Sequence, residues 1–415
     1  MTSSWQRTVA VMFAAQLLAS VGFSTIFPFL PNYVESLGAR SGGSMLFWVS
    51  AVFSVQAVAM MIASPIWGAV ADRYGRKLMV ERALFGGAVI ILAMGFARSA
   101  EELVFLRLIQ GMVTGVVSAA SSMVAAVTPR ERLGYAMGLM QTAQWAGVSV
   151  GPVIGGLLEY FVGYRMAFVV TAVLLFAGGV LVLFAVKEDF TPPEGAGRGL
   201  GGMFAAWGGI VRTPGVVLAY GLRFTAWLGR TMLVPFLPLF IATITVRGEL
   251  SGIYTGVAIG AASAAGTLSG VSLGRLGDRI GHKSVLVVSA VAAAAFYLPM
   301  AVVSEIWQLI ALNTLVGFAV GGVLPSISAL LARFTDAGAA GSVYGLDNSV
   351  GAASRAVAPL LAGFVVAVTS GTGAANYRAL FVVTAVLFLA TAALAAWRLP
   401  GRIRPASVDA AASKG

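Results

Sequence analysis

Long apolar stretches separated by short charged breaks follow one another along the whole chain. A helix needs about 20 apolar residues to cross the hydrocarbon core of a bilayer. Proline and glycine inside the stretches do not argue against helices, because membrane helices tolerate both. The first stretch follows Arg7 and is too long for a signal-peptide core, so we expect an uncleaved helix. The pattern predicts twelve transmembrane helices, over residues 9–34, 46–70, 79–97, 103–127, 135–158, 164–186, 215–246, 251–274, 284–303, 307–332, 342–368 and 377–398.

Composition supports a membrane protein and excludes several other classes. Hydrophobic residues make up 59% of the 415 residues and charged residues only 10%, against about 25% in an ordinary soluble domain. Mean hydropathy is +0.90. A soluble fold cannot bury so much apolar surface, which excludes a soluble enzyme, a disordered chain and a nucleic-acid-binding protein. Cysteine is absent and there is one histidine, which argues against thiolate or histidine metal sites.

The basic residues are distributed unevenly between the two sides of the predicted helices. With the N-terminus in the cytoplasm, 18 of the 27 basic residues fall on the cytoplasmic side and five outside. This split obeys the positive-inside rule and predicts that both termini are cytoplasmic. The net charge of +11 therefore reports orientation rather than a nucleic-acid partner. The remaining four basic residues fall within helices: Arg107, Arg223, Arg230 and Arg355.

The two halves of the chain repeat each other at a spacing of 206 or 207 residues. The paired motifs include Pro28-Phe29-Leu30-Pro31 with Pro235-Phe236-Leu237-Pro238, Asp72-Arg73-x-Gly75-x-Lys77 with Asp278-Arg279-x-Gly281-x-Lys283, and Gly111-x-x-x-Gly115 with Gly317-x-x-x-Gly321. Two parallel six-helix repeats are typical of alternating-access transporters. We therefore predict a first six-helix bundle over 1–186, a cytoplasmic linker over 187–213, a second bundle over 214–400 and a cytoplasmic tail over 401–415.

Three motifs resemble signatures of the major facilitator superfamily. They are Gly68-x-x-x-Asp72-Arg73-x-Gly75-Arg76-Lys77 between helices 2 and 3, Arg107-x-x-Gln110-Gly111 in helix 4, and Gly147-x-x-x-Gly151-Pro152-x-x-Gly155-Gly156 in helix 5. The chain looks most similar to the twelve-helix drug:proton antiporters of that family. The resemblance implies an all-α integral membrane fold of two pseudo-symmetric six-helix bundles. It also implies a monomer that is driven by the proton gradient and needs no cofactor.

The loop after helix 2 and its second copy carry the candidate conformational latch. Gly68 allows close helix packing and Gly75 a tight turn, while Asp72 can face the N-terminus of a neighbouring helix. The resemblance implies that these residues, with Arg73, Arg76, Lys77, Asp278 and Arg279, hold the halves together in the outward-facing state. A basic loop that only sets orientation is the alternative. We expect His282, which replaces Arg76 in the second copy, to be a solvated substitute for a cation.

A polar stripe follows one face of helix 4, with Arg107, Gln110, Thr114 and Ser118 three or four residues apart. We expect this stripe to line a water-filled cavity. Glu35 and Glu159, at the outer ends of helices 1 and 5, are the candidate partners of Arg107. The resemblance implies that Arg107 assists proton transfer, and a purely structural salt bridge is the alternative.

The second half departs from the first in its buried charges. Asn313 stands where the repeat would place a second Arg107, while Arg223 and Arg230 share a face of helix 7 and Asp347 and Arg355 a face of helix 11. Charges inside a bilayer are costly and are candidates for function. The surplus of arginine leads us to expect anionic, zwitterionic or lipid-like substrates rather than cations. Alternatively, these arginines pair with Asp347, helix C-termini and carbonyls and never meet substrate.

Other candidate residues complete the predicted sites. Gly147, Gly151 and Gly155 form one smooth face of helix 5, and ordinary tight packing is the alternative to an antiporter role. Asp347 joins Arg107, Glu35 and Glu159 as a candidate for proton coupling. The predicted substrate cavity comprises Gln16, Phe23, Phe27, Gln110, Thr114, Gln141, Trp145, Arg223, Arg230, Asn313 and Arg355. For the aromatic residues of this set, packing against lipid or between helices is the alternative.

These features together predict a proton-coupled secondary transporter of the inner membrane that exports small amphiphilic or drug-like molecules. Its partners would be the lipid bilayer, protons and a small-molecule substrate, with no nucleic acid. A symporter, or a flippase for lipid-linked or anionic amphiphiles, is the alternative within the same fold. A membrane-embedded enzyme would need clustered histidines, cysteines or acids at bilayer depth, whereas the sequence offers one histidine, no cysteine and the isolated Asp347. An ATP-driven pump would need a phosphate-binding loop, and the sequence contains no such motif.

Overall fold

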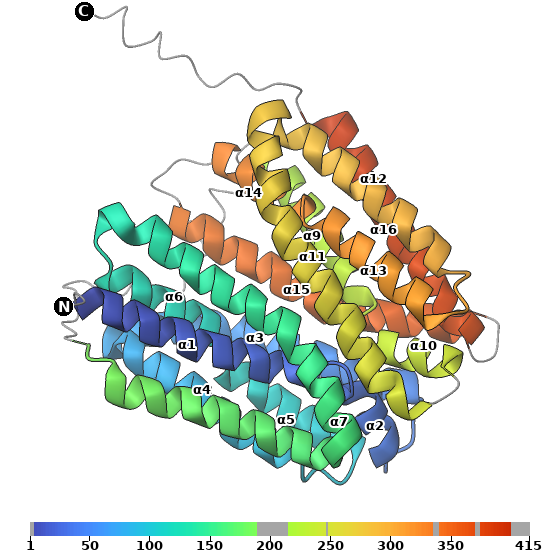
Figure 1. The fold of residues 1–415 in the computed structure, drawn as a ribbon, viewed down its shortest axis with the longest axis horizontal. Helices are drawn as coiled ribbons and strands as arrows, with labels where there is room; N and C mark the ends of the chain where they lie inside the picture. The colour runs from blue at the N-terminus through green and yellow to red at the C-terminus, as the bar shows by residue number, and fades with distance from the viewer. Residues whose placement is uncertain (1–3, 189–214, 246–247, 335–339, 370–373, 400–415) are drawn as a thin grey trace, which may run out of the picture.

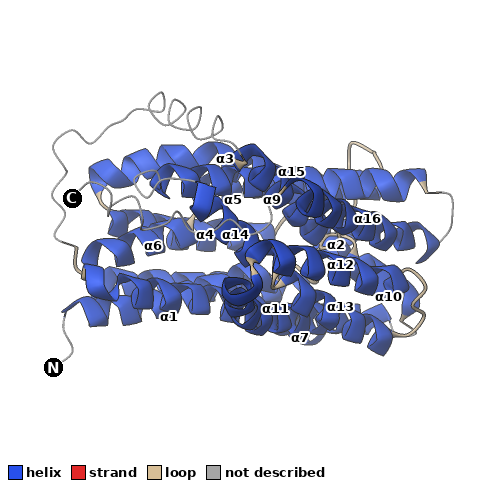
Figure 2. Cartoon of the chain, turned by 90° about the horizontal axis from the view of Figure 1, so that it is seen from above, coloured by secondary structure: helices blue, strands red, loops and turns tan. Residues whose placement is uncertain are grey.

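The computed structural model describes residues 4–188, 215–245, 248–334, 340–369 and 374–399. These residues form helices and connecting turns, and no strand occurs among them (Figure 2). Two single-turn helices, η1 (Arg130–Arg132) and η2 (Gly248–Leu250), lie in connections. The longer helices are α1 (Ser4–Thr25), α2 (Leu30–Leu37), α3 (Met45–Tyr74), α4 (Arg76–Met94), α5 (Ala100–Val113), α6 (Val116–Val127), α7 (Leu133–Ala185), α9 (Val216–Met232), α10 (Leu237–Ile244), α11 (Ser251–Ile280), α12 (His282–Met300), α13 (Ile306–Val320), α14 (Val323–Phe334), α15 (Ala340–Val368) and α16 (Ala374–Arg398).

These helices make twelve passes, as the apolar pattern predicted. Pro28 and Pro235 lie in the breaks that divide the first and seventh passes into α1–α2 and α9–α10, because proline removes a backbone donor. Glycines break the fourth and tenth passes, between α5 and α6 and between α13 and α14. Helix α7 contains the fifth and sixth passes, which join at Gly163 with φ of 76°. Ten helical stretches are long and apolar enough to span a membrane; the second pass of α7 and the charged α4 complete the twelve.

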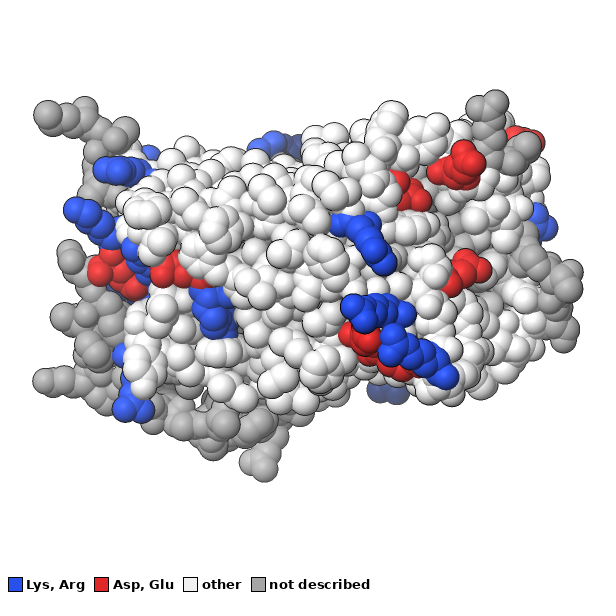
Figure 3. All heavy atoms as spheres, turned by 90° about the horizontal axis from the view of Figure 1, so that it is seen from below, with Lys and Arg blue, Asp and Glu red and all other residues white. Residues whose placement is uncertain are grey.

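The helices form two groups, α1–α7 and α9–α16, that lie side by side (Figure 1). The start of α1, the end of α7, the start of α9 and the end of α16 share one end of the molecule, which we call the terminal end. Helices α2 and α10 lie at the opposite end, called the far end (Figure 1). Figure 3 shows a wide uncharged surface between charged side chains that gather toward the two ends. The predicted linker beyond Glu188 and the predicted tail 401–415 lie outside the described residues.

Glycine allows the two groups to approach closely in the half of the molecule nearer the far end. A Cβ atom added to Gly156 of α7 would lie 2.3 Å from the carbonyl oxygen of Gly252 on α11. One added to Gly256 would lie 2.2 Å from the carbonyl oxygen of Pro152. On the other flank, a Cβ at Gly363 of α15 would lie 2.3 Å from Ser50 Oγ of α3. At these three glycine positions, a larger side chain would therefore not fit while the far end is closed.

Candidate functional site

A buried ion pair joins three helices of the second group. Arg223 on α9 donates from Nη2 to Oδ2 of Asp347 on α15 at 2.5 Å, with side chains only 12% and 14% exposed. Its Nη1 donates to Ser328 Oγ at 2.8 Å and to the Leu324 carbonyl at 3.3 Å, both on α14. Burying charges is costly unless they are paired and hydrogen-bonded, and this pair meets both conditions. Asp347 therefore pairs with an arginine of another helix rather than with a cation of a loop.

The other two arginines of the second group lie against aromatic rings. The guanidinium carbon of Arg230 lies 5.3 Å from the ring centroid of Trp145 and 5.7 Å from that of Trp227. The guanidinium carbon of Arg355 lies 5.5 Å from the Trp227 ring. Both arginines are partly buried, Arg355 near the middle of α15 and Arg230 near the end of α9, midway along the seventh pass. Trp145 belongs to the first group and the other three residues to the second, so this cluster lies between the two groups.

Arg107 does not pair with either acid that we expected. It is 1% exposed, donates from Nε to the Val52 carbonyl of α3 at 3.2 Å and from Nη1 to Gln110 Oε1 at 2.7 Å. Its guanidinium also lies 5.5 Å from the Phe53 ring. Glu35 is exposed at the far end. The predicted Arg107–acid pair is therefore wrong for this structure, because the side chain turns inward against α3.

Glu159, the second expected partner of Arg107, takes part instead in the contact between the groups. Its carboxylate rests on the backbone of α11, where a Cβ at Gly252 would lie 2.0 Å from Oε2. That oxygen is buried and has no hydrogen-bond partner. Close by, Asn32 Nδ2 of α2 donates to Ser251 Oγ of α11 at 3.3 Å. Glu159 is therefore part of the closed far end.

The repeat explains what Asn313 does in place of a second arginine. Asn313 donates from Nδ2 to the Ala258 carbonyl at 2.8 Å, as Arg107 donates to Val52. The two acceptors are themselves 206 residues apart. The neighbouring glycines match as well, since a Cβ at Gly111 would lie 2.2 Å from the Gln56 carbonyl and one at Gly317 2.1 Å from the Ala262 carbonyl. A neutral amide thus makes in the second group the helix-to-helix contact that a cation makes in the first.

The polar stripe of the fourth pass, which α5 and α6 form, does not line an open cavity in this structure. Gln110 is fully buried, and Thr114, also buried, donates to the Gln110 carbonyl at 2.7 Å. The helix breaks directly afterwards at Gly115, whose φ of 147° only glycine adopts readily. Ser118 is exposed beyond that break. The expectation of a continuous cavity-lining stripe is wrong, because the break changes the face that α6 presents.

The remaining predicted cavity residues occupy several environments. Phe27 stacks on Phe53 with centroids 6.2 Å apart, and Phe23 packs where a Cβ at Gly87 would lie 3.2 Å from its ring. These contacts are interhelical packing within the first group. Gln16 is buried and donates to Ser20 Oγ at 3.1 Å, whereas Gln141 is exposed. The structure therefore does not gather these four residues around one cavity.

The fifth pass, which is the first part of α7, presents small residues on two faces. Added Cβ atoms at Gly147, Gly151 and Gly155 would lie 2.4, 2.0 and 1.8 Å from atoms of Ser20, Ser24 and Thr25 on α1. Ser24 Oγ also donates to the Gly147 carbonyl at 3.0 Å. This face therefore packs within the first group, whereas Pro152 and Gly156 face α11 of the second. The glycines serve close packing on both sides of the same helix.

The candidate latch contacts its own group in both copies. Lys77 Nζ donates to the Leu183 carbonyl at 2.9 Å, and Lys283 Nζ to the Leu399 carbonyl at 2.5 Å. The carboxylate of Glu188 accepts from the backbone N–H groups of Arg76 and Lys77 at 3.0 and 2.7 Å. It thereby caps the N-terminus of α4. These contacts fix each loop to the last helix of its own bundle.

Several other latch residues are described only in part. Arg73 is exposed and lies 5.4 Å from the Tyr74 ring, while the surroundings of Gly68 and the side chain of Asp72 are not among the described features. Both Gly75 and Gly281 adopt positive φ, 97° and 98°, and allow the tight turns. Asp278 pairs with His282 at 3.2 Å.

His282 is 6% exposed, so the expectation of a solvated side chain is wrong. It packs tightly against Gly277 of α11, on the other side of the turn at Gly281, where a Cβ would lie 2.4 Å from its Nδ1.

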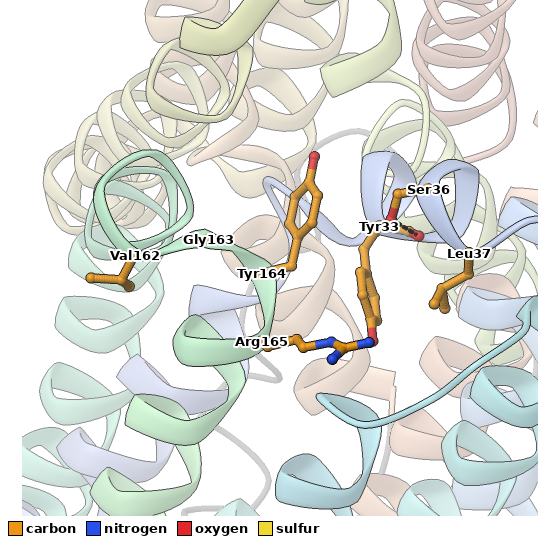
Figure 4. A pocket seen from close by; sticks show the side chains of 7 residues that line it. All are labelled: Tyr33, Ser36, Leu37, Val162, Gly163, Tyr164 and Arg165. Carbon is orange, nitrogen blue, oxygen red and sulfur yellow. Dashed lines mark hydrogen bonds between the residues drawn. The ribbon is translucent and has the colours of Figure 1, made fainter.

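Two cavities open at the far end. The larger, about 540 Å³, is lined by both groups and includes Asn32, Glu35 and Glu159 from the first and Glu249 and Ser251 from the second. The smaller, about 380 Å³, lies at the turn within α7 (Figure 4). There Arg165 extends toward Tyr33, whose hydroxyl donates to the Met94 carbonyl at 2.9 Å. Neither cavity contains the buried arginines.

Three residues take part in these contacts that the sequence did not single out. Trp227 lies one helical turn before Arg230, a spacing that could have indicated their contact. Glu188 follows the last apolar stretch and gave no signal of its cap on α4. Arg82 belongs to the basic residues assigned to the cytoplasmic side, and no sequence pattern indicated that it lies 3.5 Å from the Trp67 ring centroid. Only the packing of separate helices reveals the last two contacts.

Comparison with known proteins gives one family over the whole chain. The family model described as Major Facilitator Superfamily matches residues 12–225 and 219–414. The chain is 33% identical over 406 residues to multidrug resistance protein MdtG of Serratia proteamaculans (strain 568), covering 97% of this chain and 96% of that protein. It is 31% identical over 408 residues to MdtG of Rahnella sp. (strain Y9602), covering 98% and 97%.

Solved structures agree at the level of the fold. The nucleoside transporter NupG superposes with a TM-score of 0.78 at 14% identity, covering 95% of this chain and all of that one. A bacterial homologue of the human lysosomal transporter Spinster, in an inward-facing and unoccupied conformation, has a TM-score of 0.77 at 14% identity. That match covers 98% of this chain and 100% of the homologue. The helical fold of this chain therefore belongs to a recurring architecture.

Proposed function

The chain belongs to the Major Facilitator Superfamily, and from this premise we propose that it is a proton-coupled exporter of small amphiphilic or drug-like molecules. It is a multi-pass membrane transporter and not an enzyme. The observation that carries the proposal of export is the full-length similarity to proteins named for multidrug resistance. The proton gradient would be the energy source, with no cofactor, and the transporter would act as a monomer.

Alternating access in this chain would operate through the glycine-lined contact between the groups. In this structure α7 meets α11 and α3 meets α15 near the far end, while Arg73 and Tyr74 are exposed at the terminal end. We assign the terminal end to the cytoplasm of a cell with an inner membrane, because the sequence predicts 18 basic residues on the cytoplasmic side and five on the other. The structure then corresponds to an inward-facing state. The latch around Asp72 would engage the second group only when that end closes.

Proton coupling would use the pair formed by Arg223 and Asp347. Asp347 is the acid that the structure places inside a transmembrane pass with an arginine partner from another helix. Protonating it would remove one charge of the pair and leave Arg223 to rely on Ser328 and the Leu324 carbonyl. Such a change alters the relative stability of two helix arrangements, which is what coupling requires. Arg107, Glu35 and Glu159 would then act in the first group and at the far end.

Substrate-induced proton movement in proteoliposomes tests this proposal. A panel of lipophilic cations, anions and neutral amphiphiles is added across an imposed pH gradient, and the internal pH is followed. We expect an active compound to drive protons opposite to its own movement; movement in the same direction would indicate a symporter. No proton movement with any transported compound would refute proton coupling.

Variants of the ion pair separate coupling from folding. We expect Asp347→Asn to abolish proton movement, while Glu131→Gln in the exposed helix η1 serves as the matched control. Removing one member of a buried pair costs about 3–5 kcal/mol because the other charge stays buried. The double variant Arg223→Gln with Asp347→Asn removes both charges and should recover stability without coupling. Normal coupling in that double variant would exclude the pair as the proton site.

A further inference from the structure

We propose that Arg230, Arg355, Trp145 and Trp227 form a binding site for amphiphilic anions at the interface between the two groups. We call these four residues the arginine–tryptophan cluster. The inference rests on the proposed transport function and names the substrate class that the cluster would accept: a molecule with a negative charge on an apolar, planar or aromatic body.

The two arginines of the cluster lack acidic partners. Among the described residues, neither Arg230 nor Arg355 forms an ion pair or a hydrogen bond, and the embedded Asp347 is already held by Arg223. Arg223 differs from the other two, because both of its terminal nitrogens donate hydrogen bonds and one of them is paired with Asp347. An unneutralised cation in the membrane interior is costly. A bound anion would supply the charge that the protein itself does not.

The positions of the cluster place it where a transported molecule must pass. Arg230 lies midway along the seventh pass, Arg355 midway along α15, and Trp145 near the middle of the fifth pass. The contact between Arg230 and Trp145 crosses from one group to the other. A ligand that inserts there would touch both groups at once and would therefore influence their relative arrangement.

The geometry favours an anion over a cation. Indole rings attract cations through their faces, but the Trp227 ring already has the guanidinium groups of Arg230 and Arg355 beside it, and the Trp145 ring has that of Arg230. A cationic ligand would meet two like charges, whereas an anion would meet two opposite ones. Both guanidinium carbons lie within 5.7 Å of the Trp227 ring centroid, so we place the anionic group of the ligand beside this ring. The Trp145 ring, which has one guanidinium contact among the described residues, would pack the apolar part of the ligand.

Gly351 of α15 lies beside two donors of the cluster. A Cβ at this position would lie 3.4 Å from Arg355 Nη1 and 3.8 Å from Trp227 Nε1. Because glycine has no side chain, the space beside a guanidinium and an indole N–H stays open at this point, and both groups can donate hydrogen bonds to a ligand.

Tetraphenylborate and tetraphenylphosphonium test the inference, because the two ions have nearly the same size and shape and opposite charge. Their affinities are measured by calorimetry on the full-length purified protein in detergent. We expect the anion to bind at least about tenfold more tightly. Equal binding, or tighter binding of the cation, would overturn the inference.

Charge-neutral variants locate the site. We expect Arg230→Gln and Arg355→Gln each to weaken tetraphenylborate binding by about tenfold or more and to leave tetraphenylphosphonium binding unchanged or stronger. Arg130→Gln, at an exposed position of η1, is the matched control. If either arginine variant fails to fold, Trp227→Phe serves as a further variant, because it keeps an aromatic ring and removes the indole donor. Unchanged anion binding in both Trp227→Phe and the remaining arginine variant would refute the site.

Binding and transport measurements together distinguish a failure of the anion site from a failure of the proposed transport function. Gradient-driven transport of cations together with absent anion binding would reject the anion site and leave the exporter intact. Anion binding without gradient-driven transport of any compound would retain the site and reject the exporter.

Discussion

The glycine contact at the far end makes a quantitative prediction for Gly156→Ala. The new Cβ would lie 2.3 Å from the Gly252 carbonyl oxygen and 2.6 Å from its carbon, whereas ordinary contacts begin near 3.4 Å. Helices α7 and α11 must therefore separate by about 1 Å, and overpacking of this kind costs about 1–3 kcal/mol. Because the strain exists only while the far end is closed, the population should shift toward the outward-open state by about fivefold to 150-fold.

Distance measurements between spin labels can follow this shift without interference, because the chain has no cysteine of its own. Labels at Ser36→Cys and Glu249→Cys lie on opposite groups around the same far-end cavity. We expect a longer distance to gain population in Gly156→Ala. Gly221→Ala is the matched control, since no atom lies within 4 Å of its added Cβ.

A second glycine shows whether backbone contact is the cause. The Cβ of Gly252→Ala would meet the end of the flexible Glu159 side chain, which can move aside at low cost. We therefore expect a smaller shift than in Gly156→Ala. Identical distance distributions in Gly156→Ala and the unsubstituted protein would refute the steric account of the closed far end.

Three further predictions concern stability and coupling. Glu188→Gln should lower stability by about 1 kcal/mol, because the charged cap on the N-terminus of α4 is lost, and thermal unfolding should show a smaller difference at high salt. Arg107→Asn should fold like the unsubstituted protein, since Asn313 makes the equivalent contact, but should lose proton-coupled flux in liposomes; unaltered flux would assign Arg107 a structural role only. Gly115→Ala should destabilise the protein by about 1–3 kcal/mol because of its φ of 147°, whereas Gly134→Ala, which meets no atom, should not change the unfolding temperature.

The sequence by itself determined the number of passes, the duplication of the six-helix half and the close-packing face of the fifth pass in α7. Length and hydropathy decide how many helices fit a bilayer, and these quantities are local. The spacing of Gly147, Gly151 and Gly155 fixes one face of a helix because the helical repeat is regular. The motifs also indicated the family, because three of them, in residues 68–77, 107–111 and 147–156, resemble signatures of the major facilitator superfamily.

Only the tertiary structure decided which partner each buried charge has. Periodicity places Arg107 on a face of its helix, but the rotation of that helix against α3 turned the side chain to the Val52 carbonyl rather than to Glu35 or Glu159. Asp347 and Arg223 are 124 residues apart in the chain, and no local pattern brings them together. The pairing of charges depends on how whole helices pack. The sequence could therefore count the buried arginines, but it could not distinguish Arg223, which pairs with Asp347, from Arg230 and Arg355, which lie against tryptophan.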